Sequence, residues 1–65
     1  MEEIHAWVAR DRNSNIFIYE NQPIKVKRGG YWALGLPCIP LPKGWFTEVQ
    51  WQDKEPTKVK LVIDK

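Results

Sequence analysis

The feature that most constrains this chain is that its fold cannot be stabilised by an internal disulfide or by a structural zinc site of its own. It has 65 residues, with one cysteine, Cys38, and one histidine, His5. A single cysteine forms no internal disulfide, and one cysteine with one histidine cannot complete a four-ligand structural zinc site. A domain of this length buries only about 60% of the surface that its unfolded chain exposes. We therefore expect one domain, residues 1–65, stabilised by side-chain packing or by a partner subunit.

Aromatic side chains supply most of the packing material. The chain has four tryptophans, two tyrosines and two phenylalanines, and each ring can bury roughly 150–250 Å². This is more than one small core easily accommodates, so most of the rings should be structural and some should be partly exposed.

Alternating and β-branched residues predict strands over much of the chain. Residues 4–10 and 16–19 are rich in β-branched and aromatic side chains and are joined by a polar turn at residues 11–15, so they predict a hairpin. Residues 24–27 alternate apolar and basic side chains, which predicts a strand with one dry and one wet face. Residues 57–63 alternate again and predict a final strand.

Prolines limit what can form in between. Pro37, Pro40 and Pro42 cannot donate to a central ladder, so residues 38–41 can form at most a short edge strand. Pro42 stands at a plausible first helical position, and the apolar side chains that follow it are spaced for one short helix near residues 43–49. The predicted fold class is mainly β (α+β): a small antiparallel sheet or partly open barrel of four or five strands with that one helix.

Several segments in this order resemble a group of short proteins of unassigned function that are encoded by gut bacterial genomes and their phages. The resemblance covers most of the chain and is carried by residues 7–11, 16–19, 41–51 and 55–59, with Pro23 after the hairpin. It implies a setting, a mobile or accessory gene whose small product acts by binding. It brings no activity, cofactor or functional residue with it.

Catalysis has one conventional candidate pair, Cys38 and His5. Cys38 stands among prolines without a glycine-rich turn or helix start to lower its pKa, and a lone cysteine between Pro37 and Ile39 is most often a small buried apolar group. The carboxylates lie in polar or terminal segments, where charges are normally solvated. Gly29 and Gly30 lack the glycine spacing of a phosphate-binding loop. We therefore expect a protein that is not an enzyme and has no metal and no cofactor.

Binding to single-stranded nucleic acid is one open alternative. A small β platform can stack bases on aromatic rings while basic side chains follow the phosphates. The net charge of only +2 argues against this function, and alternating lysines also serve simply to keep one face of a sheet wet. The residues that would form such a platform are Lys25, Lys27, Arg28, Tyr31 and Trp32, with Lys58 and Lys60 on a neighbouring strand.

Binding to a protein partner is the function that the sequence favours. Aromatic rings in a segment stiffened by prolines, here residues 31–46, lose little conformational entropy on binding. The competing interpretation is that this segment folds back as a lid over the sheet. We expect Trp45, Phe46 and Val49 to point inward and Tyr31 and Trp32 outward, with a homodimer left open. The predicted partner-binding residues are Tyr31, Trp32, Lys25, Lys27 and Arg28.

The start of the chain and its hydropathy predict the compartment. Residues 1–3 are acidic where a secretory signal would be basic, and the longest apolar stretches are far shorter than the roughly 20 residues of a membrane span. A single unpaired thiol agrees with a reducing compartment. We expect a cytoplasmic protein with no membrane partner.

Overall fold

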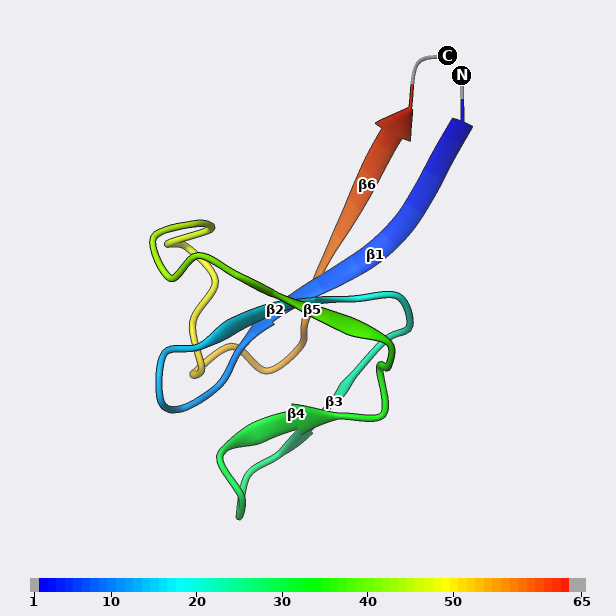
Figure 1. Cartoon of the computed structure of the whole chain (residues 1–65). Coiled ribbons are helices and arrows are strands. Elements are labelled where there is room, and N and C mark those ends of the chain that lie inside the picture. Colours follow the sequence, from blue (N-terminus) through cyan, green and yellow to red (C-terminus); the bar gives the residue numbers. More distant parts are fainter. Residues whose placement is uncertain (1, 64–65) are drawn as a thin grey trace.

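Six β-strands make up the regular structure of residues 2–63. The computed structural model describes residues 2–63, and side chains from residue 3 to residue 62. Figure 1 shows the arrangement of the strands. In chain order they are β1 (Glu2–Arg10), β2 (Ile16–Tyr19), β3 (Ile24–Val26), β4 (Tyr31–Ala33), β5 (Cys38–Leu41) and β6 (Thr57–Ile63).

Four of the strands form one antiparallel sheet in the order β5-β2-β1-β6. The predicted hairpin is confirmed, with Val8 opposite Ile18 in β1 and β2. The short strand at Cys38–Leu41 is confirmed at one edge, and the final strand forms the other edge with Leu61 opposite Ile4. Residues 7–10 of β1 pair with β2, whereas residues 2–8 pair with β6, so β1 and β6 extend together beyond the rest of the sheet as an arm (Figure 1).

Strands β3 and β4 form a separate two-stranded sheet, in which Lys25 lies opposite Trp32. Strand β4 is not among the predicted elements. The predicted alternation in β3 is wrong: Ile24, expected on the dry face, is 52% exposed, and Lys25, expected on the wet face, is half-buried. The hairpin turns Lys25 toward tryptophan rings, so its packing overrides the period-two pattern.

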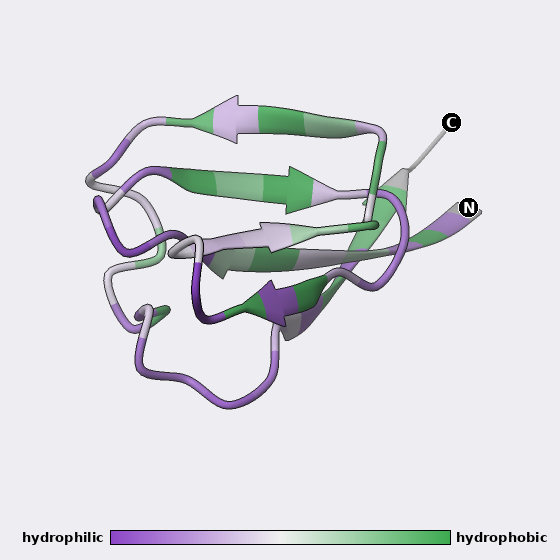
Figure 2. Cartoon of the chain, turned by 90° about the horizontal axis from the view of Figure 1, so that it is seen from below, coloured by the Kyte–Doolittle hydropathy of each residue, from purple (hydrophilic) through white to green (hydrophobic). Residues whose placement is uncertain are grey.

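Two small cores lie on opposite faces of the four-stranded sheet. Because side chains alternate along a strand, the register divides them between two faces. We call the face that carries Val8 and Ile16 face A, and the face that carries Ala9 and Tyr19 face B. Residues 42–50 cover part of face A with Val49, and the β3–β4 hairpin covers face B with Trp32. The apolar residues gather on the strands and the hydrophilic ones on the connections (Figure 2).

The predicted helix near residues 43–49 is wrong, because residues 2–63 contain no helix. Two separate turns replace it, closed by the Trp45 N–H donating to the Pro42 carbonyl and the Val49 N–H donating to the Phe46 carbonyl. Phe46 also has φ of 53°, which interrupts right-handed helical geometry. The fold is thus a small all-strand structure that is not closed into a barrel.

The buried guanidinium of Arg10 explains why these turns persist. It is 8% exposed and donates to backbone carbonyls from two connections. Nε donates to the Val49 carbonyl at 2.7 Å and Nη2 to the Trp45 carbonyl at 2.9 Å, and further bonds reach Ser14, Lys43 and Phe46. A helix over residues 43–49 would engage several of these carbonyls within its own backbone. Arg10 therefore takes the place of helical hydrogen bonds in this segment.

Burial corrects one expectation for this segment and confirms two. Val49 is 2% exposed and Phe46 packs against the same cluster, as predicted. Trp45, which was expected to point inward, is 54% exposed. The helical spacing that grouped the three residues does not exist in two consecutive turns, so Trp45 is exposed while Val49 is buried.

Candidate functional site

The expected outward pair Tyr31 and Trp32 is split between surface and core. Tyr31 is 46% exposed, as predicted, but Trp32 is 6% exposed and packs with Ala9 and Tyr19. The Trp32 indole N–H donates to the Arg10 carbonyl at 3.0 Å. Adjacent residues of a strand point to opposite faces, so both rings cannot face outward once this segment is strand β4. The expectation that Trp32 points outward is therefore wrong.

The predicted contact residue Lys25 and a second cation, Arg12, which was not among the predicted residues, are engaged within the fold. The Lys25 ammonium lies 4.5 Å from the centroid of the Trp51 ring and 5.5 Å from that of Trp32, and it donates to the Trp51 carbonyl. The Arg12 guanidinium lies 5.3 Å from the Trp51 centroid and donates to the Lys27 carbonyl. Such cation–π contacts stabilise the packing of the hairpin against the connector that carries Trp51.

The other predicted residues gather at the β3–β4 turn. Lys27, Arg28 and Tyr31 are exposed, and the Tyr31 ring lies against Gly29, where it leaves no room for a Cβ. Beside this turn is a shallow notch of about 380 Å³ lined by Arg12, Asn13, Gly29 and Gly30. The structure thus brings together three of the five predicted residues in a small basic surface.

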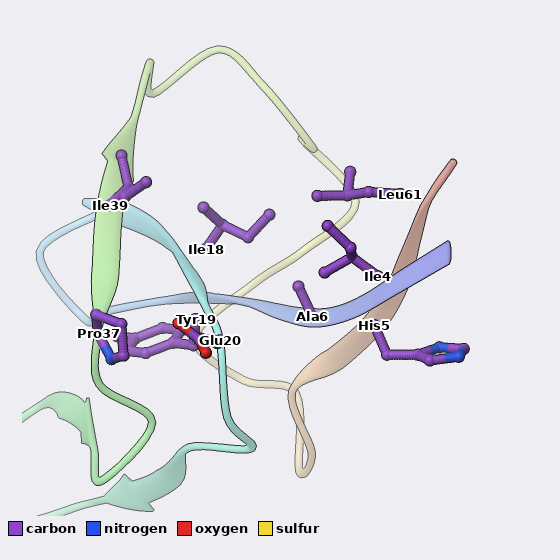
Figure 3. Close-up of a pocket in the computed structure, with 9 residues that line it drawn as sticks. All are labelled: Ile4, His5, Ala6, Ile18, Tyr19, Glu20, Pro37, Ile39 and Leu61. Atoms are coloured by element: carbon purple, nitrogen blue, oxygen red, sulfur yellow. The ribbon is translucent and has the colours of Figure 1, made fainter. Parts of the chain in front are cut away.

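A larger hollow lies on face A, where the sequence analysis placed no site. It has a volume of about 460 Å³, and aliphatic side chains from each strand of the sheet project into it: Ile4 and Ala6, Ile18, Ile39 and Leu61 (Figure 3). Ile39 is 64% exposed, Leu61 45% and Ile4 42%. We call this the apolar groove. It is the part of face A that residues 42–50 leave uncovered.

The chemistry of the apolar groove is almost entirely hydrophobic. Among its lining residues only His5, Tyr19 and Glu20 carry an ionisable group. The side chain of His5 projects away from the groove aliphatics, on the other side of the strands (Figure 3). Such a surface recognises apolar groups by shape and area and provides no donor arrangement for a phosphate.

The geometry keeps the one conventional catalytic pair apart. Cys38 aligns with Tyr19, which aligns with Trp7, so Cys38 and His5 are separated by two strand spacings, about 10 Å, and by a further two residues along β1. A hydrogen bond between nucleophile and base is impossible at that distance. In the described part of the chain, no three His, Cys, Asp or Glu side chains lie close enough together to hold a metal ion.

Burial perturbs two ionisable groups beneath the β3–β4 hairpin. It raises the pKa of Asp11, and the backbone N–H of Trp32, which donates to this carboxylate at 3.1 Å, lowers the same pKa by a smaller amount. Burial, followed by the neighbouring Asp11 and Cys38, raises the pKa of Tyr19 far above its ordinary value. Tyr19 therefore stays a neutral phenol at neutral pH.

Part of the apolar groove could have been found from the sequence. The hairpin register follows from its turn, and it places Ile4, Ala6 and Ile18 on one face. No local sequence pattern predicts that β5 pairs with β2, or how much of face A residues 42–50 cover. The groove was missed because the residues that would cover it were assigned to a helix.

Comparison with known proteins gave no relative from which a role could be assigned. No protein-family model matches the sequence, and no curated protein and no solved structure matches the chain. Residues 2–63 include no helix long and apolar enough to span a membrane.

Proposed function

We propose that this chain is a small, non-enzymatic accessory protein of the cytoplasm that binds a protein partner stoichiometrically through the apolar groove. The expected setting in a mobile or accessory gene of gut bacteria or phages is part of the same proposal. The groove replaces Trp32 and Lys25 as the centre of the contact surface, because these two side chains are already engaged within the fold.

The observation that carries the proposal is the uncovered half of face A. Ile39, Leu61 and Ile4 project from three strands of the sheet, β5, β6 and β1, into one hollow and are between 42% and 64% exposed. Burying such side chains gains about 25 cal/mol for each Å² removed from water. A contiguous apolar surface of this kind is typical of interaction sites in soluble proteins.

The shape and chemistry of the groove favour a protein over other ligands. A small-molecule site usually buries 70–90% of its ligand, whereas this hollow is walled by side chains that are themselves about half exposed. Its lining contains no lysine or arginine, so it offers nothing to a phosphate backbone. Apolar side chains of another protein, presented from a firm backbone, fit both properties.

Capture from a lysate of the native host cell, treated with nuclease, tests the proposal. The protein should retain a protein partner in equimolar amount, and Ile39→Thr should weaken retention at least tenfold because it removes the most exposed apolar side chain of the groove. Threonine keeps the β-branched shape that suits strand β5.

Ile24→Thr is the matched control. It makes the same substitution at a strand position of similar exposure, 52% against 64%, outside the groove. Retention that is unchanged in Ile39→Thr, or reduced equally in both variants, would contradict the proposed site.

A second candidate function rests on the basic β3–β4 turn. Lys27 and Arg28 are exposed at the same β3–β4 turn as Tyr31, and residues 21–47 contain no acidic side chain. These are the elements of a weak single-strand binding surface. If it operates, an oligothymidine should bind with an affinity that falls steeply with salt, and Lys27→Gln/Arg28→Gln should abolish this binding. Binding that is absent at low salt would exclude this function.

A further inference from the structure

The two edges of the four-stranded sheet differ in their capacity to accept another strand. The Glu20 N–H donates to the Pro37 carbonyl. In an antiparallel pair, this bond fixes which residues of β5 direct their backbone N–H and carbonyl groups toward β2. The backbone polar groups of Ile39 and Leu41 therefore point toward β2, whereas those of Cys38 and Pro40 point outward from the sheet edge. Pro40 has no N–H, so the free edge of β5 offers very few donors. This edge is closed to further pairing.

The edge formed by β6 is open. The Asp11 N–H donates to the Asn15 carbonyl. By the same alternation, the backbone polar groups of the odd-numbered residues of β1 point toward β2, and those of the even-numbered residues point toward β6. Thr57, Val59 and Leu61 therefore bond to β1, and the backbone N–H and carbonyl groups of Lys58, Lys60 and Val62 face outward. Strand β6 is seven residues long and has no proline.

The side chains of β6 specify what could pair with this edge. Val59 and Leu61 belong to face A, and Leu61 lines the apolar groove. Lys58 and Lys60 project from face B and are exposed. The Lys60 ammonium lies 3.4 Å from the Glu3 carboxylate, in a solvent-exposed pair, and the Lys58 ammonium lies 5.8 Å from the centroid of the Trp7 ring. A strand paired with β6 would place alternate side chains beside the two apolar residues and beside the two lysines.

We infer that the edge of β6 binds an extended segment of the partner protein in which apolar and acidic residues alternate. The apolar side chains of that segment continue face A into the groove, and its carboxylates lie opposite Lys58 and Lys60. This inference rests on the proposed function, because the groove then receives the apolar side of the added strand. Strand addition of this type draws its affinity from main-chain hydrogen bonds and its specificity from alternate side chains.

The lysines disfavour a second copy of this chain at the same edge. An antiparallel β6–β6 pair centred on Lys60 places Lys60 opposite its own copy, and a pair centred on Val59 places Lys58 opposite Lys60. A pair centred on Leu61 avoids this repulsion but joins only residues 59–63 of each described strand. An acidic segment at this edge is attracted by Lys58 and Lys60, whereas the lysines of a second copy would be repelled by them.

A synthetic peptide tests the inference directly. The probe is a capped seven-residue peptide of alternating glutamate and valine, and its control has lysine in place of each glutamate. Titration into the 15N-labelled protein should shift the amide signals of Lys58, Lys60 and Val62 with the acidic peptide only. The double reversal Lys58→Glu/Lys60→Glu should exchange the preference between the two peptides.

A pair of variants isolates the backbone of the edge. Lys60→Ala and Lys60→Pro remove the same charge, but only proline removes the outward N–H, and an edge strand tolerates proline when its N–H faces solvent. We expect Lys60→Pro to bind the acidic peptide at least tenfold more weakly than Lys60→Ala does, while Val59 and Leu61 amides keep their protection from exchange.

Several results would overturn the inference. These are no binding of the acidic peptide, equal binding of both peptides, equal affinity of the two Lys60 variants, or self-association through β6 that the peptide does not displace. A captured partner that is lost with Ile39→Thr but retained with Lys60→Pro would leave the proposed function standing and remove the edge from it. A partner that survives both variants would contradict both proposals.

Discussion

At the scale of single residues, Arg10 has the widest structural reach. Its guanidinium joins the β1–β2 turn to residues 42–50 through hydrogen bonds to the carbonyls of Ser14, Lys43, Trp45, Phe46 and Val49. No carboxylate takes part in these bonds, so the charge is stabilised by oriented backbone dipoles. A planar fork of five donors suits this arrangement, and an ammonium group does not.

Arg10→Lys should therefore destabilise the fold strongly. Lysine keeps the positive charge but cannot reach all of these carbonyls, and buried polar groups left unpaired cost about 1–3 kcal/mol each. We expect the free energy of unfolding in urea to fall by about 3 kcal/mol. Arg12→Lys, at an exposed arginine, is the control and should cost under about 1 kcal/mol. Equal losses in the two variants would contradict the role of Arg10.

Asp11 gives the stability a measurable pH dependence. Burial raises the pKa of Asp11 above its ordinary value of 3.8, so the folded state binds the proton more tightly than the unfolded chain does. The contribution of Asp11 to the free energy of unfolding therefore decreases as pH rises from the ordinary value through the folded pKa, and is constant above it. Asp11→Asn keeps an acceptor for the Trp32 N–H and abolishes this titration.

The comparison of wild type with Asp11→Asn isolates the effect from that of the other carboxylates. Between pH 3 and pH 7, the stability of wild type relative to the variant should fall as pH rises, as measured by urea unfolding at each pH. A relative stability that rises with pH would mean that the carboxylate is stabilised as an anion, against the stated cause of the shift.

At the scale of elements, local pattern predicted the strands of the main sheet well. The expected hairpin, the short edge strand and the final strand are all present, because each depends on alternation or on the backbone restrictions of proline. Two elements escaped this reasoning. Strand β4 has only three residues, and residues 42–50 take their shape from Arg10, which is more than 30 residues away in sequence. Contacts of that separation leave no periodic signal in the segment itself.

A pair of alanine variants distinguishes the observed turns from the expected helix. Val49 is 2% exposed and covers face A, whereas Trp45 is 54% exposed. Val49→Ala should reduce the free energy of unfolding by about 2 kcal/mol through lost burial and a cavity. Trp45→Ala should cost under about 1 kcal/mol despite the larger side chain. The opposite order, measured by urea unfolding, would restore the inward tryptophan of the helical interpretation.

At the scale of the whole molecule, the two faces of the sheet are unequally covered. Around Ala9 and Tyr19, face B is covered by the β3–β4 hairpin and by Trp51, whereas residues 42–50 cover only part of face A. Two of the predicted contact residues, Lys25 and Trp32, belong to the packing that covers face B. The expectation that some aromatic rings are partly exposed is confirmed by Tyr31 and Trp45, but which part of the sheet stays uncovered depends on the packing of connections.

The groove and the open β6 edge adjoin one another through Leu61. A partner that adds a strand there gains main-chain hydrogen bonds and apolar burial in the same contact. The arm of β1 and β6 projects from the body (Figure 1), and a two-stranded ribbon is only marginally stable by itself in water. Binding at this place would support the arm as well as cover the groove.

The most direct test of the central claim measures which isoleucine methyl groups a partner covers. The protein would be labelled at isoleucine δ1-methyls and studied by NMR with a soluble gadolinium chelate, before and after addition of unlabelled, nuclease-treated host lysate. Buried Ile16 serves as the internal reference. We predict that Ile4 and Ile39 lose most of their paramagnetic relaxation while Ile24 keeps it. Retained relaxation at Ile39, or an equal loss at Ile24, would contradict the apolar groove as the partner-binding surface.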